Sequence, residues 1–314
     1  MKKEPTQTIS RRSALKRMGL LVAGAAALGV PATLASCQNK RVPSRLLLYF
    51  TATGNCLYVA RQLADENTRL LSIPQLVKQN HYNLEADEIG IVYPIYGHMP
   101  PTMVRRFIQR ARLTAQYKFA VLTYGNRKCN AVGLWDDISR QAGCPFDYIT
   151  TMIMVDNWLP NFDMAEQMKI DKYIPESLSR IRADIGARRR WHEPFTDKER
   201  QQHEGFLART GIDPEQGFLL RSEKYFDIDP GTCIGCAACV EVCPRGNYEL
   251  TARGVTTEGD CEFCFACIHN CPQKAIGFKH LPDDPLLTRG EKNRNVRYRN
   301  EHVSLWDIKE ANRQ

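Results

Sequence analysis

Residues 46–56 read LLLYFTATGNC, a short apolar run followed by a turn that contains a glycine. The apolar part, residues 46–50, has the length and continuity of a β-strand that is buried on both faces. Apolar residues at helical spacing follow, namely Leu57, Val59, Ala60 and Leu63. A turn from a strand into a helix leaves backbone N–H groups unpaired, and the helix dipole adds positive potential there. We therefore expect a phosphate-binding loop, to which Thr51, Thr53 and Asn55 can add side-chain donors.

Strand-like and helical segments continue to alternate beyond this loop. Apolar runs of strand length recur at residues 88–94, 119–124 and 149–155, and helical patterns occur at 102–111, 131–141 and 176–187. This order, with short connections, predicts an α/β fold in which a parallel sheet has helices on both faces. Such sheets bind ligands at the carboxyl ends of the strands, near the point where the strand order reverses.

The loop does not resemble two common nucleotide sites. No lysine follows Gly54 as it would in the triphosphate loop G-x-x-x-x-G-K-[ST], so we do not expect ATP hydrolysis. No G-x-G-x-x-G motif follows a strand in residues 37–314, so a nicotinamide-binding domain of the usual kind is not expected either.

Eight of the twelve cysteines fall into two runs with the same spacing, C-x₂-C-x₂-C-x₃-C-P. Three thiolates spaced in this way can bind one cubane cluster, and the fourth cysteine of each run ligates the other cluster. The first predicted [4Fe–4S] cluster is therefore bound by Cys233, Cys236, Cys239 and Cys271. The second is bound by Cys261, Cys264, Cys267 and Cys243. The repeated spacing also indicates an internal duplication.

Zinc sites and disulfides fit this spacing less well. Zinc sites typically pair C-x₂₋₄-C units into closed sets of four, and they do not need three cysteines followed by C-P. A disulfide framework is sterically awkward when the cysteines are so close in sequence. Apart from the N-terminal region, three thiols remain, Cys56, Cys129 and Cys144, which we expect to be buried or free. A Cys129–Cys144 disulfide stays open as an alternative.

The loop at residues 51–56 resembles the FMN-phosphate loop of flavodoxins, which usually reads T/S-x-T-G-N followed by a hydroxyl residue. The resemblance implies that FMN is bound by Thr51, Ala52, Thr53, Gly54, Asn55 and Cys56, with Cys56 in place of the hydroxyl residue. Two later segments fall where flavodoxins line the isoalloxazine ring, namely Pro94, Ile95, Tyr96 and Gly97, and Tyr124, Gly125 and Asn126. Ordinary turns and loop aromatics remain the alternative. His98 could hydrogen-bond the ring, although we expect a surface histidine.

Residues 45–280 as a whole resemble a bacterial fusion family in which a flavodoxin-like domain precedes a two-cluster ferredoxin. The resemblance implies a doubly wound parallel sheet followed by a small α+β domain of the bacterial 2[4Fe–4S] ferredoxin type. It extends to Tyr298-Arg299-Asn300, which such proteins also show. We expect a flavodoxin-like domain at 45–190, a connecting segment at 191–224, a ferredoxin domain at 225–280 and a charged C-terminal tail at 281–314.

The N-terminus has the order of regions that is typical of an export signal. Arg11 and Arg12 precede an uncharged, weakly apolar segment, and this arrangement resembles a Tat signal. Leu34-Ala35-Ser36-Cys37 resembles a lipobox, whose cysteine is acylated. We expect a signal peptide at 1–36, a linker at 37–44 and a lipid anchor at Cys37, at the outer face of the cytoplasmic membrane or in the periplasm. An uncleaved anchor helix is the alternative.

Most of the net charge of +8 comes from this N-terminal segment. Residues 1–36 hold six basic side chains and one acid, so the remainder has 37 bases and 34 acids. No later stretch forms a basic stripe with interleaved aromatic residues, so we expect no nucleic-acid binding.

The combination of cofactors predicts the function. An iron–sulfur cluster exchanges one electron, whereas a flavin exchanges one or two. We therefore expect electron transfer between two [4Fe–4S] clusters and FMN, with redox proteins as partners. A flavin-dependent reductase of a small quinone or nitro compound is an alternative, and a flavin-free domain that only docks is another. The seven histidines are scattered and no Ser/His/Asp set is present, so the sequence indicates no catalytic residues.

Overall fold

The computed structural model describes residues 44–287 and 290–314. The predicted signal peptide at 1–36 and the predicted lipidation site at Cys37 lie outside these residues. Within them, no helix combines the length and the apolar character that crossing a membrane requires.

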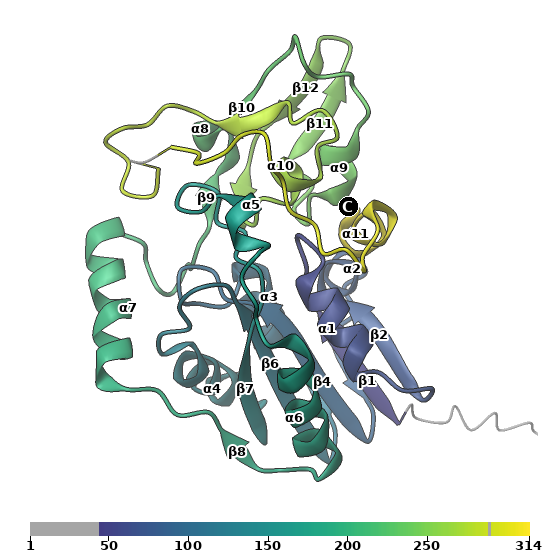
Figure 1. The fold of residues 1–314 in the computed structure, drawn as a ribbon. Coiled ribbons are helices and arrows are strands. Elements are labelled where there is room, and N and C mark those ends of the chain that lie inside the picture. The colour runs from purple at the N-terminus through teal and green to yellow at the C-terminus, as the bar shows by residue number, and fades with distance from the viewer. Residues whose placement is uncertain (1–43, 288–289) are drawn as a thin grey trace, which may run out of the picture. The chain divides into compact units, whose positions relative to one another are not determined.

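Six parallel strands form the main sheet, in the order β2-β1-β4-β6-β7-β8 (Figure 1). Their bounds are β1 Arg45–Tyr49, β2 Thr68–Ser72, β4 Glu88–Pro94, β6 Tyr117–Tyr124, β7 Tyr148–Ile153 and β8 Trp191–His192. The chain runs from β1 to its neighbour β2 and then crosses to β4 on the other side, so the strand order reverses at β1. This is the flavodoxin-like order of doubly wound sheets, which confirms the predicted fold class. A separate parallel pair is formed by β3 (Asn83–Glu85) and β5 (Arg112–Thr114).

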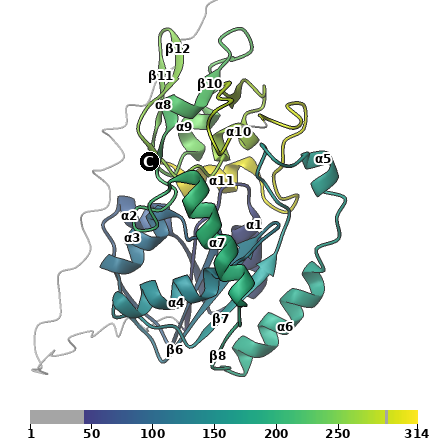
Figure 2. The same cartoon turned by 90° about the vertical axis from the view of Figure 1, so that its left-hand side faces the viewer.

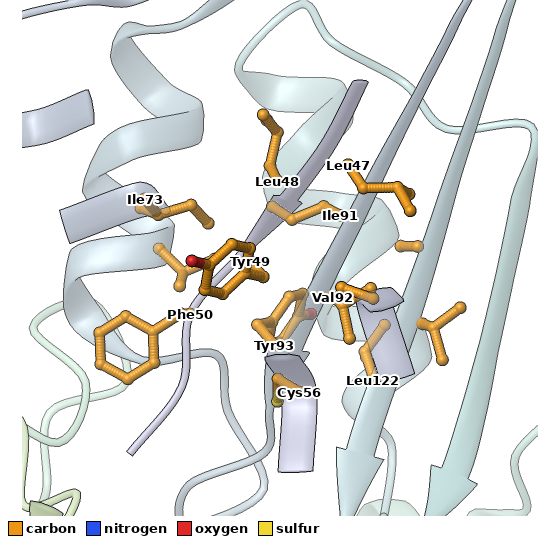
Figure 3. Packing of buried hydrophobic residues seen from close by; sticks show 14 of the residues in the cluster. Leu47, Leu48, Tyr49, Phe50, Cys56, Ile73, Ile91, Val92, Tyr93 and Leu122 are labelled. Carbon is orange, nitrogen blue, oxygen red and sulfur yellow. The ribbon is translucent and has the colours of Figure 1, made fainter. Parts of the chain in front are cut away.

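Helices cover the sheet in two groups. α1 (Asn55–Leu63) contacts α6 (Ile174–Gly186), whereas α2 (Ile73–Lys78) contacts α3 (Thr102–Arg110), which in turn contacts α4 (Ala131–Gln141). The strand side chains beneath the helices are almost completely buried, as Figure 3 shows for Leu47, Ile91 and Leu122. Such continuous burial explains why the strands read as unbroken apolar runs in the sequence.

Residues 226–278 form two short antiparallel sheets and two short helices. β10 (Phe226–Ile228) pairs with β14 (Ile276–Phe278), and β11 (Tyr248–Thr251) pairs with β12 (Gly254–Thr257). α9 (Ala238–Val242) and α10 (Ala266–Asn270) contact each other, and each follows a residue with a left-handed backbone, Ala237 and Phe265 respectively. Each cysteine run therefore ends in a short helix, in agreement with the duplication that the sequence indicates.

Residues 191–224 contain more structure than the predicted connection. They contribute β8 to the main sheet and form α7 (Asp197–Thr210), β9 (Leu220–Arg221) and α8 (Ser222–Tyr225). Figure 2 shows α7 running from the β8 end of the sheet toward the region of α9 and α10. The sequence pattern did not predict α7, because most of the residues in this helix are polar and His203 is its one buried residue.

Residues 281–314, predicted as a charged tail, contain α11 (Leu305–Asn312), which contacts both α9 and α2. A capping box at Ser304 and Asp307 starts the helix, and its buried residues are Ile308, Ala311 and Asn312. Two minor elements complete the described chain. β13 (Asp260–Cys261) pairs with β9, and α5 (Met164–Gln167) lies between β7 and α6 in sequence.

Candidate cofactor sites

The loops at the carboxyl ends of β1, β4, β6 and β7 surround a cavity of about 210 Å³. The cavity is lined by all the predicted flavin-contact residues except Gly54, namely Thr51, Ala52, Thr53, Asn55, Cys56, Pro94, Ile95, Tyr96, Gly97, Tyr124, Gly125 and Asn126. Three segments that lie far apart in the sequence thus come together at the edge where a doubly wound sheet binds its ligand.

The loop at residues 51–54 offers hydrogen-bond donors to this cavity. The Gly54 N–H donates to Thr51 Oγ1 over 3.1 Å, and Asn157 Nδ2 donates to Thr53 Oγ1 over 3.4 Å. Each threonine oxygen therefore accepts a hydrogen bond, while its own hydroxyl hydrogen remains free to be donated. In the described chain α1 starts after Gly54 without a side-chain cap, so its first N–H groups add donors. These groups fit a phosphate.

Asn55 and Gly54 also make contacts within the chain that the sequence did not predict. Asn55 Nδ2 donates to the Val155 carbonyl over 3.1 Å, and Asn55 Oδ1 accepts from the Tyr298 hydroxyl over 2.6 Å. One N–H of this amide therefore fixes the loop, and its second N–H remains a donor beside the cavity. Gly54 has a φ of 96°, and a Cβ there would approach Val303 Cβ to 2.9 Å. Glycine is needed at this position for the left-handed backbone and for contact with the C-terminal segment.

Cys56 is a packing residue beneath the loop. It is 1% exposed, and its Sγ lies 3.1 Å from Thr123 Oγ1. Burial raises the pKa of this thiol to about 12, so it is neutral and unreactive at pH 7. Cys129 and Cys144 are also buried free thiols whose pKa values are raised by burial, so the two do not form the disulfide that the sequence left open.

His98 is buried, which corrects the expectation of a surface histidine. It is 7% exposed, lines the cavity and has a left-handed backbone with a φ of 69°. Its Nδ1 has no hydrogen-bond partner among the described residues. Burial and, to a smaller extent, the neighbouring His203 lower the pKa of His98 to about 3, so the imidazole is neutral at pH 7. A buried imidazole with a free nitrogen fits a hydrogen bond to a ligand in the cavity.

The structure adds walls to the cavity that the sequence analysis missed. The loop after β7 contributes Asp156, Asn157 and Trp158, and α7 contributes Phe206 and Arg209. The loop after β7 could have been predicted as a wall, because it follows a parallel strand and so emerges at the same edge of the sheet as the other loops. α7 gave no such signal, since its place depends on packing between distant segments.

The two cysteine runs form two separate cavities, each lined by four cysteines. One cavity is lined by Cys233, Cys236, Cys239 and Cys271, and the other by Cys243, Cys261, Cys264 and Cys267. The structure therefore brings together the same two sets that the spacing predicts, with one cysteine exchanged between the runs. In residues 44–287 and 290–314, no three or more His, Cys, Asp or Glu side chains converge closely enough to hold a single metal ion.

Burial holds the buried cysteines of the two cavities in the neutral form when no metal is bound. It raises the pKa values of Cys239 and Cys264 to about 12, and it raises the pKa values of Cys261 and Cys267 well above the usual value for a thiol. Cluster binding must therefore displace protons from these thiols. Donors to the sulfur atoms are already in place, as shown by the Tyr248 hydroxyl, which lies 3.1 Å from Cys267 Sγ. Such hydrogen bonds help to set the potential of a cluster.

The two cysteine sets differ in exposure. In the first set Cys236 is exposed and Cys233 and Cys271 are half-buried, whereas all four cysteines of the second set are buried. Beside the exposed Cys236, the Ile234 side chain is 65% exposed. The first set thus lies at the surface and the second lies in the interior.

The second set adjoins the cavity at the carboxyl ends of β1, β4, β6 and β7, which we call the carboxyl-edge cavity. Phe263, between Cys261 and Cys264 in the sequence, is a lining residue of that cavity. The ring of Trp158 in the same cavity lies 5.1 Å, centroid to centroid, from the ring of Phe265, which lines the cavity of the second cysteine set. The two cavities are therefore separated by little more than aromatic side chains.

Glu262 joins the second cysteine run to the main sheet's helices. Its carboxylate is 1% exposed, accepts from the Met103 N–H at the start of α3 over 2.9 Å, and accepts from Arg245 Nε over 2.8 Å. Burial raises the pKa of Glu262, although Arg245 opposes the rise. A second link is made by Asn270 of α10, whose Nδ2 donates to the Ala52 carbonyl over 3.2 Å.

Comparison with known proteins gives one family match. Residues 226–278 match the family described as 4Fe-4S dicluster domain, which supports iron–sulfur binding by this region. No curated protein matches the chain. A solved flavoprotein in complex with FMN from Lactobacillus acidophilus NCFM is 14% identical over 35% of this chain and 93% of its own, with a TM-score of 0.26. A flavodoxin from the domain Archaea is 14% identical over 43% of this chain and 98% of its own, with a TM-score of 0.27.

Proposed function

We propose that this protein carries electrons between two [4Fe–4S] clusters and an FMN that are held in one folded unit. The observation that carries the proposal is the position of Phe263, which belongs to the second cysteine run and also lines the carboxyl-edge cavity. When bound, the clusters exchange single electrons and the flavin links one-electron and two-electron partners. The chain supplies the positions, the hydrogen bonds and the exclusion of water.

The residues around the carboxyl-edge cavity fit FMN. The free hydroxyl hydrogens of Thr51 and Thr53 and the uncapped start of α1 would hold the phosphate. Tyr96 and Tyr124 line the cavity where the flavodoxin resemblance places the ring, and the unpartnered Nδ1 of His98 is a further polar group beside it. The absence of lysine and arginine from the loop at 51–56 agrees with binding by backbone and hydroxyl donors.

The difference in exposure gives the two clusters different roles. The second cluster, in its buried cysteine set beside Phe263, would exchange electrons with the flavin. The first cluster, beside the exposed Cys236, would exchange electrons with a partner protein. Ile234 and Leu250 are 65% and 47% exposed. Leu250 lies close to the backbone beside Ile234, because a Cβ on Gly235 would be 3.7 Å from Leu250 Cδ1. These apolar side chains flank the first cysteine set and would form part of the partner contact.

The charge of the ferredoxin-type region favours a basic partner. Residues 226–278 contain seven acidic and three basic side chains. Each oxidised cluster with four thiolates adds a charge of about −2. A redox protein with basic side chains around its contact surface would therefore be attracted to this end of the molecule.

The proposal includes export and lipid anchoring, which rest on the N-terminal sequence alone. Arg11 and Arg12 support a Tat-type signal, and Leu34-Ala35-Ser36-Cys37 supports acylation at Cys37. The mature protein would then be held at a membrane surface outside the cytoplasm, where its partners would also be found.

Cofactor analysis of the anaerobically purified protein tests the proposal. We expect about eight iron ions and eight acid-labile sulfides per chain, from two cubane clusters. We expect the flavin released on denaturation to be FMN, because the loop at 51–56 holds one phosphate and no second nucleotide-binding motif follows it. Stoichiometric zinc without labile sulfide would exclude the clusters, and release of FAD would exclude the assigned flavin site.

A flavin-dependent reductase of a small quinone or nitro compound is a second candidate. It is favoured by the far wall of the cavity, where Phe206 and Arg209 of α7 extend the site beyond the loops that would hold the flavin. In the part of the chain that the structure describes, Arg209 forms no ion pair, so its charge is available to a ligand. Faster reoxidation of the reduced protein by a soluble naphthoquinone than by basic redox proteins would favour this candidate.

A further inference from the structure

The C-terminal segment that contains Tyr298-Arg299-Asn300 lies directly on the predicted phosphate loop. The Asn300 N–H donates to the Thr53 carbonyl over 2.8 Å, and the Tyr298 hydroxyl donates to Asn55 Oδ1 over 2.6 Å. Further along, Asn312 Nδ2 in α11 donates to the Thr51 carbonyl over 2.9 Å. Three residues of the loop are therefore held by a segment more than 240 positions later in the sequence.

These contacts are shielded from water. Tyr298 and Asn300 are 5% and 6% exposed, and Asn312 is fully buried. Asn300 Nδ2 also lies 3.3 Å from Asn55 Oδ1, so this oxygen accepts from two side chains of the same segment. Because buried amide groups are costly to leave unpaired, the segment fixes which way the Asn55 side chain points. That orientation in turn lets Asn55 Nδ2 bind the Val155 carbonyl on the other side of the cavity.

The same tyrosine is joined to the second half of the cysteine-binding region. The Tyr298 N–H donates to Nδ1 of His269, which lies in α10 between Cys267 and Cys271, over 3.1 Å. His269 Nε2 must then carry the proton, and it donates to the Asn157 carbonyl over 2.9 Å. Tyr298 thus stands between α10 and the phosphate loop, with one hydrogen bond to each.

We propose that Tyr298 is a positioning residue for the flavin phosphate and that the segment from Tyr298 to Asn312 sets the loop at 51–55 in its binding form. This inference rests on the proposed function, since it assigns FMN to the cavity. Without the tyrosine hydroxyl, Asn55 Oδ1 keeps one partner, and its amide loses the hydrogen bond that is shortest in this network. The loop at 51–55 is then held less firmly, and its donors at Thr51, Thr53 and the first N–H groups of α1 are less well placed for one phosphate.

Paired binding measurements with FMN and riboflavin test the proposal. In the Tyr298→Phe variant, with its clusters bound and its flavin removed, we expect FMN to bind about tenfold more weakly than to the unaltered protein in the same state, as for the loss of one buried hydrogen bond. Riboflavin lacks the phosphate, so its affinity should be unchanged. The ratio of the two affinities, measured by quenching of flavin fluorescence, is therefore the decisive quantity, because general destabilisation would weaken both ligands.

Tyr58→Phe is the matched control. The Tyr58 ring stacks on His302 with centroids 4.9 Å apart, and its hydroxyl forms no hydrogen bond within residues 44–287 and 290–314. We expect this variant to bind both flavins as the unaltered protein does. In an Asn55→Ala background, the further change Tyr298→Phe should have little additional effect on FMN binding, because both variants remove the same interaction.

The outcomes separate this inference from the proposed function. If the unaltered protein binds neither flavin, the proposed flavin site itself is wrong. If it binds FMN and Tyr298→Phe leaves the FMN affinity unchanged, or weakens FMN and riboflavin equally, Tyr298 is not a positioning residue for the phosphate. Iron and sulfide contents equal to those of the unaltered protein confirm that the clusters are intact in every variant that is compared.

Discussion

Cys243 follows the first three cysteines in the sequence but lines the cavity of the second set. Cys243→Ser should therefore remove the second cluster, beside Tyr248 and Phe265, and leave the first cluster with its four thiolates. We expect the iron content to fall by about half, from two cubanes to one. Iron and labile-sulfide analysis, with electron paramagnetic resonance of the reduced protein, gives the number of clusters that remain.

Cys129→Ser is the control for this prediction, because Cys129 is 2% exposed and lines neither cysteine cavity. It should keep the full iron content. If Cys243→Ser instead removes the first cluster, whose predicted ligands include Cys236, the exchange of cysteines between the runs is contradicted. Retention of both clusters as intact cubanes would also contradict it.

At the scale of secondary-structure elements, Glu262 fixes the second cysteine run to the start of α3. Glu262→Gln keeps the shape of the side chain but leaves Arg245 without its buried partner, at a cost of about 3 kcal/mol. The midpoint of thermal unfolding should therefore fall by roughly 5–10 °C. Scans at one fixed heating rate, followed by flavin release and by loss of cluster absorbance, measure this shift.

Glu166→Gln applies the same substitution to an exposed ion pair. Glu166 and Lys169 are 67% and 70% exposed in their side chains, and exposed pairs contribute little to stability. We expect an unchanged midpoint for this variant. Equal midpoints for Glu262→Gln and the unaltered protein would show that the buried carboxylate does not anchor the run.

The elements that the sequence predicts are those determined by local pattern. β4 and α4 have the predicted bounds, because a buried apolar run and a helical period are properties of adjacent residues. β8 is two residues long and α7 is mostly polar, so neither has a local pattern that predicts it. Both depend on contacts with distant parts of the chain.

The candidate sites show the same division. Cysteine spacing predicts the two sets that line the two cavities, since each set is nearly complete within one run. The loop at 51–56 is likewise predicted as part of the carboxyl-edge cavity. The contact of Tyr298 with Asn55 is not encoded in either local sequence, and neither is the shared wall at Phe263, because each joins residues that are far apart in the chain.

At the scale of the whole molecule, the candidate cofactor sites form only in the folded chain. The second cysteine set is buried, takes Cys243 from the other run and is joined through Glu262 to α3, which packs on the main sheet. The C-terminal segment then connects α10 to the loop at residues 51–55 through Tyr298. A chain that crosses a membrane unfolded cannot carry clusters bound in such a structure. A Tat-type signal, which directs the export of folded proteins, is consistent with this construction.

Replacement of Arg11 and Arg12 by lysine should therefore leave the protein in the cytoplasm with its clusters assembled, because the signal and the folded unit are separate parts of the chain. Cys37→Ala should instead give a chain without lipid, since it removes the acylated thiol. Cell fractionation, iron analysis of each fraction and intact mass of the N-terminus measure both effects. A cytoplasmic unaltered protein, or one that begins at Met1 without lipid mass, would show that the N-terminus is not such a signal. Electron transfer would still be supported in that case, because it rests on the cavities at Cys233–Cys271 and on the loop at residues 51–56.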